Sequence, residues 1–201
     1  MRKTIFFLSC LVANLGFSIT PSNALQLLID GNHRYVADQL MRPNHSSDRR
    51  EAIAAKQKPF AIIVGCSDSR VAPEIIFDQG LGDLFIVRVA GNVVGPVELD
   101  SIEYAADHLG CSCLLILGHE ACGAVTAVLD GHTQDIEAIA DLIGPAIKGA
   151  KNVEEAVKDN VRSIVQHLKK TPVLKKLIAK KKINCIGGYY ELGSGNVEIL
   201  K

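Results

Sequence analysis

The sequence has no excess of either charge, since 22 Lys and Arg residues balance 22 Asp and Glu residues. A protein that binds a phosphate backbone needs a basic patch, so this balance argues against nucleic acid as a partner. No Gly/Ser-rich or Pro-rich linker, low-complexity tract or solenoid repeat divides the chain. With 201 residues, 48% of them apolar, the sequence predicts one globular domain with one compact site.

The sequence also lacks an apolar run long enough to span a bilayer, which takes about 20 residues. Its N-terminal apolar run extends only from Ile5 to Phe17, after Arg2 and Lys3. A small-x-small pattern follows and ends at Ala24, as signal peptidase prefers. We therefore expect residues 1–24 to be an export signal and residues 25–201 to form the mature domain, periplasmic or secreted. The alternative is a membrane anchor, for which the run is short.

The cysteines cannot form a closed set of disulfides. Of six cysteines, Cys10 lies in the expected signal, and the remaining five are an odd number. Free thiols in an oxidising compartment are protected by burial or by metal binding. Cys113 and Cys185 lie in apolar segments, where we expect them to be buried, whereas Cys111 follows Gly110 and is expected to be exposed. A disulfide within this group remains an alternative.

Short apolar runs alternate with amphipathic stretches through the middle of the chain. Apolar runs rich in β-branched residues, typical of strands buried on both faces, cover residues 60–65, 84–90, 113–118 and 183–189. Helical spacing covers residues 97–109, 121–129, 133–147 and 153–168. This order predicts an α/β fold, with a mainly parallel central sheet flanked by helices.

Both ends of the chain add to this core. Residues 24–37 and 48–56 have helical patterns and form an N-terminal helical arm that would cover its own sheet or that of a neighbouring subunit. Residues 189–200 read as strand, turn and strand, with the turn at 193–196. We expect a hairpin at the edge of the sheet.

Potential metal ligands follow two of the predicted strands. Cys66 comes directly after the first strand, and His119 and Cys122 follow the third. The carboxyl ends of parallel strands meet at one edge of the sheet. Three nitrogen and sulfur ligands with one open position are typical of catalytic zinc, and a helix that starts near Ala121 would place Cys122 in its first turn. From spacing alone, buried core cysteines and a chance match remain alternatives.

Several motifs around these residues make the sequence recognisable. They are CSDSRV at 66–71, GDLF at 82–85 with Arg88, AGN at 90–92, IEYA at 102–105 and GHxxCGAV at 118–125. Together they resemble the β-class carbonic anhydrases, over nearly the whole mature chain. The resemblance implies a Zn²⁺ enzyme that hydrates carbon dioxide to bicarbonate, and a homodimer or higher oligomer with a narrow active site at the subunit interface.

The resemblance also implies roles for Asp68 and Arg70. An ionised carboxylate only accepts hydrogen bonds, so Asp68 would orient the water at the fourth position of zinc while Arg70 holds the carboxylate. In some members of the family the aspartate instead becomes the fourth metal ligand and closes the site. Without the resemblance, a surface salt bridge in a turn would be the simpler interpretation.

Three further residues match substrate-pocket positions of the family less closely. Tyr104 matches a pocket tyrosine, although an aromatic residue on a helix face is commonly part of the core. Gln79 lies one residue out of register with the family's glutamine before Pro-Gly-Asp. Gly123 would offer its backbone N–H, although a glycine at a helix start needs no such role.

Two other functions fit parts of the pattern. One is a non-catalytic zinc-binding or interaction protein, in which the fourth metal position would be permanently filled. The other is a related hydrolase that acts on a different small molecule, such as carbon disulfide. Asp68 and Arg70 favour catalysis, because a structural zinc site does not require them. Two thiolate ligands should make the activated water less acidic, so we expect the activity to rise with pH.

Overall fold

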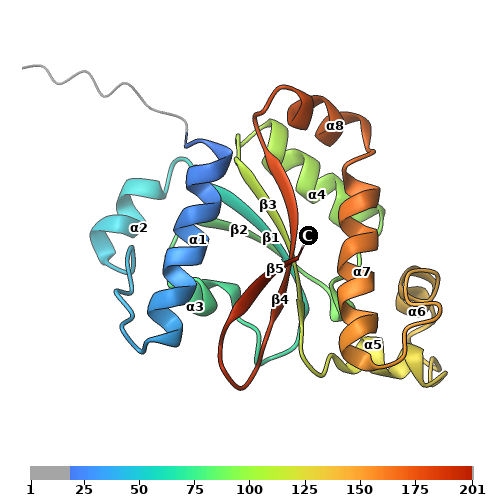
Figure 1. The fold of residues 1–201 in the computed structure, drawn as a ribbon. Helices are drawn as coiled ribbons and strands as arrows, with labels where there is room; N and C mark the ends of the chain where they lie inside the picture. The colour runs from blue at the N-terminus through green and yellow to red at the C-terminus, as the bar shows by residue number, and fades with distance from the viewer. Residues whose placement is uncertain (1–18, 201) are drawn as a thin grey trace, which may run out of the picture.

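The computed structural model describes residues 19–200, so most of the expected export signal, including Cys10, lies outside the described residues. Five strands form one sheet in the order β2-β1-β3-β4-β5, as Figure 1 shows. Pairing is parallel throughout except between β4 and β5, which are antiparallel. The mainly parallel sheet and the hairpin at its edge are therefore confirmed. The strands are β1 Ala61–Gly65, β2 Leu84–Arg88, β3 Cys113–His119, β4 Asn184–Tyr190 and β5 Val197–Leu200.

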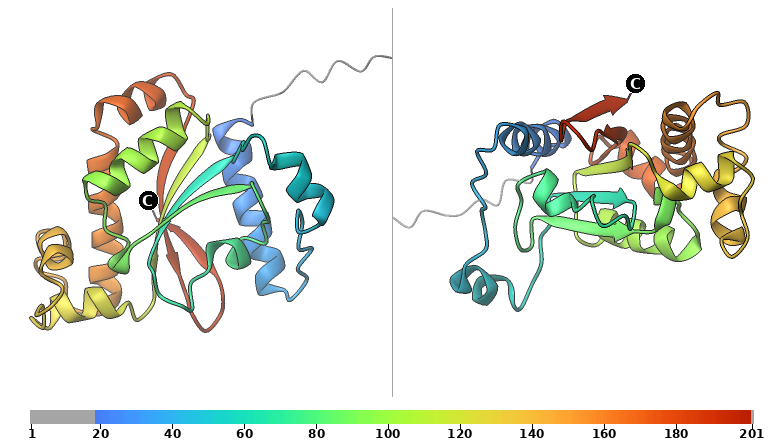
Figure 2. Two further views of the ribbon diagram at one scale, coloured as in Figure 1. Left: turned by 180° about the vertical axis from the view of Figure 1, so that it is seen from behind. Right: turned by 90° about the horizontal axis from the view of Figure 1, so that it is seen from below.

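Helices cover both faces of the sheet, which gives three layers (Figures 1 and 2). One face packs against α1 and α3, and the other against a layer formed by α4, α5, α7 and α8, with α6 packed on α5 and η1. No helix within residues 19–200 is long and apolar enough to cross a membrane. The helices are α1 Pro21–Val36, α2 Ser47–Ile53, α3 Pro73–Ile76, the 3₁₀ helix η1 Ala90–Asn92, α4 Pro96–Asp107, α5 Gly123–Leu129, α6 Glu137–Ile143, α7 Val153–Leu168 and α8 Pro172–Ala179.

The burial of each strand follows from its position in the sheet. Every residue of β1 and β3 is buried, because helices cover both faces of these central strands. Their uninterrupted apolar sequences fit that environment. At the edge of the sheet, β2 is only partly buried along most of its length. Since β2 is the outermost strand on its side, one of its edges has no strand partner among residues 19–200.

Helix α7 lies very close to the sheet because two strand residues are glycines. A Cβ added at Gly118 of β3 would lie 2.7 Å from both Val157 and Val161 of α7. One added at Gly187 of β4 would lie 2.7 Å from Val161. Larger residues here would force the helix outwards, so both glycines set the position of every α7 side chain that reaches the site.

The structure corrects several expectations. Cys111 was expected to be exposed, but it is buried, with only 2% of its surface exposed. Its Sγ donates a hydrogen bond to the Pro59 carbonyl. Cys122 is the N-cap of α5 and not a residue of its first turn, because the helix begins at Gly123. The helix expected over residues 133–147 is reduced to α6, and α8 was not expected. As for the N-terminal arm, α1 packs on the sheet of its own chain.

Candidate metal centre

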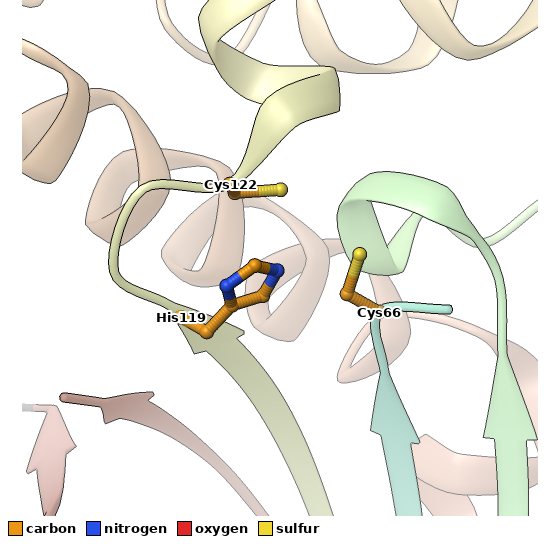
Figure 3. A group of neighbouring side chains, drawn as sticks. All are labelled: Cys66, His119 and Cys122. Atoms are coloured by element: carbon orange, nitrogen blue, oxygen red, sulfur yellow. The ribbon is translucent and has the colours of Figure 1, made fainter. Parts of the chain in front are cut away.

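The sheet register brings the expected metal ligands together. Gly65, the last residue of β1, pairs with Leu117 of β3 on one side and with Arg88 of β2 on the other. Cys66 therefore emerges beside the end of β3, where His119 is the last strand residue. Figure 3 shows the side chains of Cys66, His119 and Cys122 pointing toward one another from the strand ends and the start of α5.

A tight turn returns Cys122 to this cluster only three residues after His119. Ala121 adopts a left-handed backbone conformation, with φ at 49°. This conformation costs a residue with a Cβ roughly 1–2 kcal/mol. Since the turn puts the Cys122 sulfur next to His119 and Cys66, the strain is located where the site is assembled.

The geometry of the three side chains fits a tetrahedral metal. The Cys66 and Cys122 sulfurs and a His119 ring nitrogen all lie within 4.8 Å of one another, and all three residues are buried. Zinc bonds of 2.0–2.3 Å at tetrahedral angles would place ligand atoms about 3.3–3.8 Å apart. The cluster therefore needs only small side-chain movements to hold zinc.

The imidazole of His119 is oriented for a ligand. Its Nδ1 lies 2.8 Å from the Glu120 carbonyl oxygen, so Nδ1 carries the proton and donates to that carbonyl. This leaves the lone pair on Nε2, which is buried and has no hydrogen-bond partner in the described part of the chain. Burying a ring nitrogen without a partner is costly unless the nitrogen binds a metal. This nitrogen therefore supports zinc binding independently of the ligand distances.

The metal-free thiols and imidazole interact strongly. The pKa of the Cys66 thiol is lowered to about 4, first because Cys122 donates a hydrogen bond to it. The pKa of Cys122 is raised by the same hydrogen bond and by burial. Burial alone would lower the pKa of His119, but the Cys66 sulfur, the Glu120 carbonyl and the Asp68 carboxylate together outweigh burial and raise it. One thiolate is thus present at neutral pH before a metal arrives, as metal binding requires.

Asp68 is held at the edge of this cluster by Arg70. The guanidinium donates from Nε to Oδ1 at 2.9 Å and from Nη2 to Oδ2 at 2.7 Å, and the Arg70 backbone N–H donates to Oδ1 at 2.9 Å. These bonds hold the pKa of Asp68 well below its usual range. Oδ2 lies 3.9 Å from His119 Nε2, so the ionised carboxylate borders the metal position while bonded to Arg70.

Comparison with known proteins decides the family. The family described as carbonic anhydrase matches residues 61–197, which include all of the residues placed above. The chain belongs to the β-class carbonic anhydrases. It is 38% identical to carbonic anhydrase 2 of Mycobacterium tuberculosis over 190 residues, covering 87% of this chain and 90% of that protein.

Solved structures of β-carbonic anhydrases have the same fold. The Coccomyxa enzyme, solved in complex with acetazolamide, is 26% identical with a TM-score of 0.65, covering 88% of this chain and 86% of that one. One of two tetrameric enzymes from Sordaria macrospora is 23% identical with a TM-score of 0.63, covering 89% of this chain and 97% of that one. At 23% identity, the similarity to the Sordaria enzyme shows the fold alone.

Two residues support the β-carbonic anhydrase site in ways that the sequence did not reveal. Arg88, at the end of β2, donates to the Cys66 carbonyl at 2.9 Å and to the Asp68 carbonyl at 2.6 Å. The Gly91 N–H donates to the Cys66 sulfur at 3.3 Å. Arg88 is part of a recognised motif, but only the paired strand ends show that it clamps the loop between two functional residues.

Of the expected substrate-pocket residues, Gln79 and Tyr104 lie apart from the metal cluster within one chain, whereas Gly123 lies beside it. Gln79 donates to the Phe77 carbonyl at 3.0 Å and lines a cavity of about 690 Å³ whose lining includes none of the three ligands. Tyr104 is 47% exposed on α4, near the rings of Phe85 and His108. Gly123 is the first residue of α5, next to Cys122, and a Cβ there would contact nothing within 4 Å. Their substrate roles stay predictions.

Proposed function

We propose that this chain catalyses the reversible hydration of carbon dioxide to bicarbonate and a proton, with zinc held by Cys66, His119 and Cys122. The observation that carries the proposal is the buried three-ligand cluster, in which His119 Nε2 has no other partner, with the Arg70-bound Asp68 beside it. Three ligands leave one position for water, as in catalytic zinc sites.

Zinc, when bound, lowers the pKa of the water it holds, so that a nucleophile for carbon dioxide is available near neutral pH. The protein supplies the orientation. Asp68 remains ionised, because Arg70 lowers its pKa, so it would accept a hydrogen bond at this position and donate none. In that way it would orient a water at the open position beside the three ligands. The Glu120 carbonyl fixes the His119 tautomer, and Arg88 holds the loop that carries Cys66 and Asp68.

The orientation of Asp68 supports an open site. In the structure both carboxylate oxygens are bonded to Arg70, and Asp68 is not part of the three-residue metal cluster. A closed site, with Asp68 as the fourth ligand, would require both Arg70 side-chain bonds to break. We infer that the Arg70-bound arrangement is the active one.

Zinc content and carbon dioxide hydration of the wild type and of Cys66→Ser test the proposal. The wild type should hold one zinc per chain and be active, and Cys66→Ser should lose most of both. Cys111→Ser is the matched control, because Cys111 lies outside the cluster and a serine hydroxyl can still donate to the Pro59 carbonyl. Full zinc without hydration in the wild type would instead indicate a non-catalytic zinc protein or a hydrolase for another small molecule.

We also propose that the enzyme is a homodimer formed across the free edge of β2. Large apolar side chains are exposed around this edge: Ile75 at 57% and Leu81 at 45% line one cavity with Leu84 of β2, and Tyr104 lies beside Phe85 of β2. An unpaired strand edge next to apolar surface is a site for association. A second copy would cover both.

Light scattering coupled to size exclusion tests the dimer. The wild type should have twice the mass of one chain, and the double variant Ile75→Lys/Leu81→Lys should be monomeric. Leu142→Lys, at a residue of α6 that is 46% exposed, is the control and should stay dimeric. A monomeric wild type, or a double variant that remains a dimer, would contradict this interface.

Finally, we propose that the chain is exported to the periplasm or secreted, on the pattern of residues 1–24. The cleavage position bears on the fold, because α1 begins at Pro21, Ala24 is fully buried and Ser112 Oγ donates to the Ile19 carbonyl at 2.6 Å. Cleavage after Ala24 would remove these contacts, whereas a cut before Ile19 would keep them. Intact mass of the exported protein distinguishes these positions, and an unprocessed intracellular product would refute export.

A further inference from the structure

Helix α7 contributes a buried polar side chain next to the metal centre. Asn160 is 1% exposed and lies between Val157 and Val161, both fully buried core residues of the same helix. Its Nδ2 donates to the Gly91 carbonyl at 3.0 Å. The N–H of the same glycine donates to the sulfur of Cys66. Asn160 is thus one residue removed from a zinc ligand.

Packing alone does not account for Asn160. Its Oδ1 is buried and has no hydrogen-bond partner among residues 19–200. A buried, unsatisfied amide oxygen destabilises the fold, whereas an aliphatic side chain would leave no polar atom unpaired there. The contact with Gly91 is the only hydrogen bond that the side chain makes in the described part of the chain. Within the described residues, the bond to Gly91 is thus the one polar interaction that offsets the burial of this amide.

Gly91 is held in a conformation that other residues would not adopt easily. Its φ is 68°, in the left-handed region, and a Cβ would lie 2.7 Å from Ile143 and 3.3 Å from Ala124. It lies in η1, the short turn between β2 and α4. The bond from Asn160 ties this turn to α7, whose height above the sheet is set by Gly118 and Gly187.

We propose that Asn160 is a positioning residue of the metal centre: it fixes Gly91 so that the Gly91 N–H stays aimed at the Cys66 thiolate. This inference rests on the proposed zinc site. A hydrogen bond to a coordinating thiolate withdraws charge from the sulfur and fixes its direction. Without Asn160, Cys66 keeps its bond from the Asp68 N–H at 3.4 Å but has a freer partner in Gly91.

Metal affinity and the spectrum of the cobalt-substituted enzyme test this role. In Asn160→Leu, which keeps the branched shape but removes the donor, zinc affinity measured by chelator competition should fall about 10-fold, the lower end for supporting residues of metal sites. In the Co²⁺ enzyme, the sulfur-to-metal charge-transfer band should move to longer wavelength, because a thiolate with a weaker hydrogen bond gives up its electrons more easily.

Asn32→Leu is the matched control. Asn32 is also buried, at 3% exposed, and its Nδ2 donates to the Ile76 and Gly195 carbonyls, away from the metal centre. It should lower the melting temperature and leave the cobalt band and the zinc affinity unchanged. If Asn160→Leu does not fold, Asn160→Ser, with a shorter side chain that cannot span the same distance, is measured in the same way.

The outcomes separate this inference from the zinc site itself. If the wild type binds Co²⁺ with a thiolate band and the folded Asn160 variants match it in band position and zinc affinity, the positioning role is wrong and the zinc site stands. If the wild type shows no thiolate band with Co²⁺, the proposed ligand set is wrong. Equal shifts in the Asn32 and Asn160 variants would also refute the role, because general loosening would then explain both.

Discussion

Replacing Arg70 by alanine tests how the enzyme keeps its metal site open. Arg70→Ala removes two of the three donors that hold the Asp68 carboxylate and leaves the backbone N–H of residue 70. The pKa of Asp68 should then rise toward the ordinary value of about 3.9, which is still far below neutral pH. Asp68 therefore stays charged at pH 7, and what changes is its freedom to rotate.

The freed carboxylate has a short path to the metal, because Oδ2 already lies 3.9 Å from His119 Nε2. We expect kcat/KM at pH 7 to fall about 10- to 100-fold, as for other supporting residues of metal sites. The remaining backbone donor favours the lower end of that range. The melting temperature should hardly change, because Arg70 is half exposed and solvent screens the ion pair.

X-ray absorption of the zinc enzyme gives the matching structural result. In Arg70→Ala the fourth ligand should become a carboxylate oxygen in an increased fraction of molecules. Arg70→Lys, which keeps the charge but not the two parallel donors, should lie between the wild type and the alanine variant. An Arg70→Ala enzyme with wild-type kcat/KM and unchanged metal coordination would refute the reasoning.

Three further predictions concern a buried carboxylate, a glycine beside the metal centre and the reactivity of two buried cysteines. Asp78→Asn should destabilise the protein by about 2–3 kcal/mol, because buried Asp78 accepts from Arg34 at 2.6 Å and from two backbone N–H groups. These bonds lower the pKa of Asp78 despite its burial, so wild-type stability in urea should fall below about pH 4, and the variant should lose less there. Gly123→Ala should change stability by less than about 0.5 kcal/mol, since the added methyl meets nothing within 4 Å. The variant keeps the residue 123 N–H, so kcat/KM should fall only because the methyl narrows the space in which that N–H would meet the substrate. Chelation of zinc should abolish hydration and make Cys66 reactive toward a thiol reagent at neutral pH, whereas Cys113 should react only after unfolding.

The sequence allowed the sheet and the metal ligands to be predicted for the same reason. Uninterrupted apolar runs identify strands buried on both faces, and parallel strands bring their carboxyl ends to one edge. Cys66 and His119 directly follow or end such runs, so their proximity required no knowledge of side-chain packing. The helix expected to start near Ala121 begins two residues later, at Gly123, because a left-handed Ala121 is not signalled by sequence.

Contacts that depend on tertiary packing could not be predicted. Asn160 and Gly91 are separated by 69 residues, and their bond exists only because glycines in β3 and β4 let α7 approach the sheet. Cys111 is likewise buried by packing in the core, and its Sγ bonds to the carbonyl of Pro59, 52 residues earlier in the chain. Hydrophobic periodicity does not predict contacts between distant residues. The one signal in the sequence was an asparagine at a position of α7 flanked by apolar, core-facing residues.

The same geometry explains why cysteines of one chain have different chemistry. Cys113 begins β3 and Cys185 lies near the start of the parallel β4, so both are at the end of the sheet opposite the metal site, which lies where β1 and β3 end. Six residues separate Cys113 from His119 along the strand, or about 20 Å at 3.3 Å per residue. No side-chain movement spans that distance. Burial raises the pKa of Cys113 to about 12 and, despite the opposing charge of Lys169, that of Cys185 to about 11, so both stay protonated. Cys66, at the other end of the sheet, meets donors from Cys122, Asp68 and Gly91 and ionises at a pKa of about 4. The strand end at which a cysteine lies therefore decides whether it serves as a metal ligand or as part of the core.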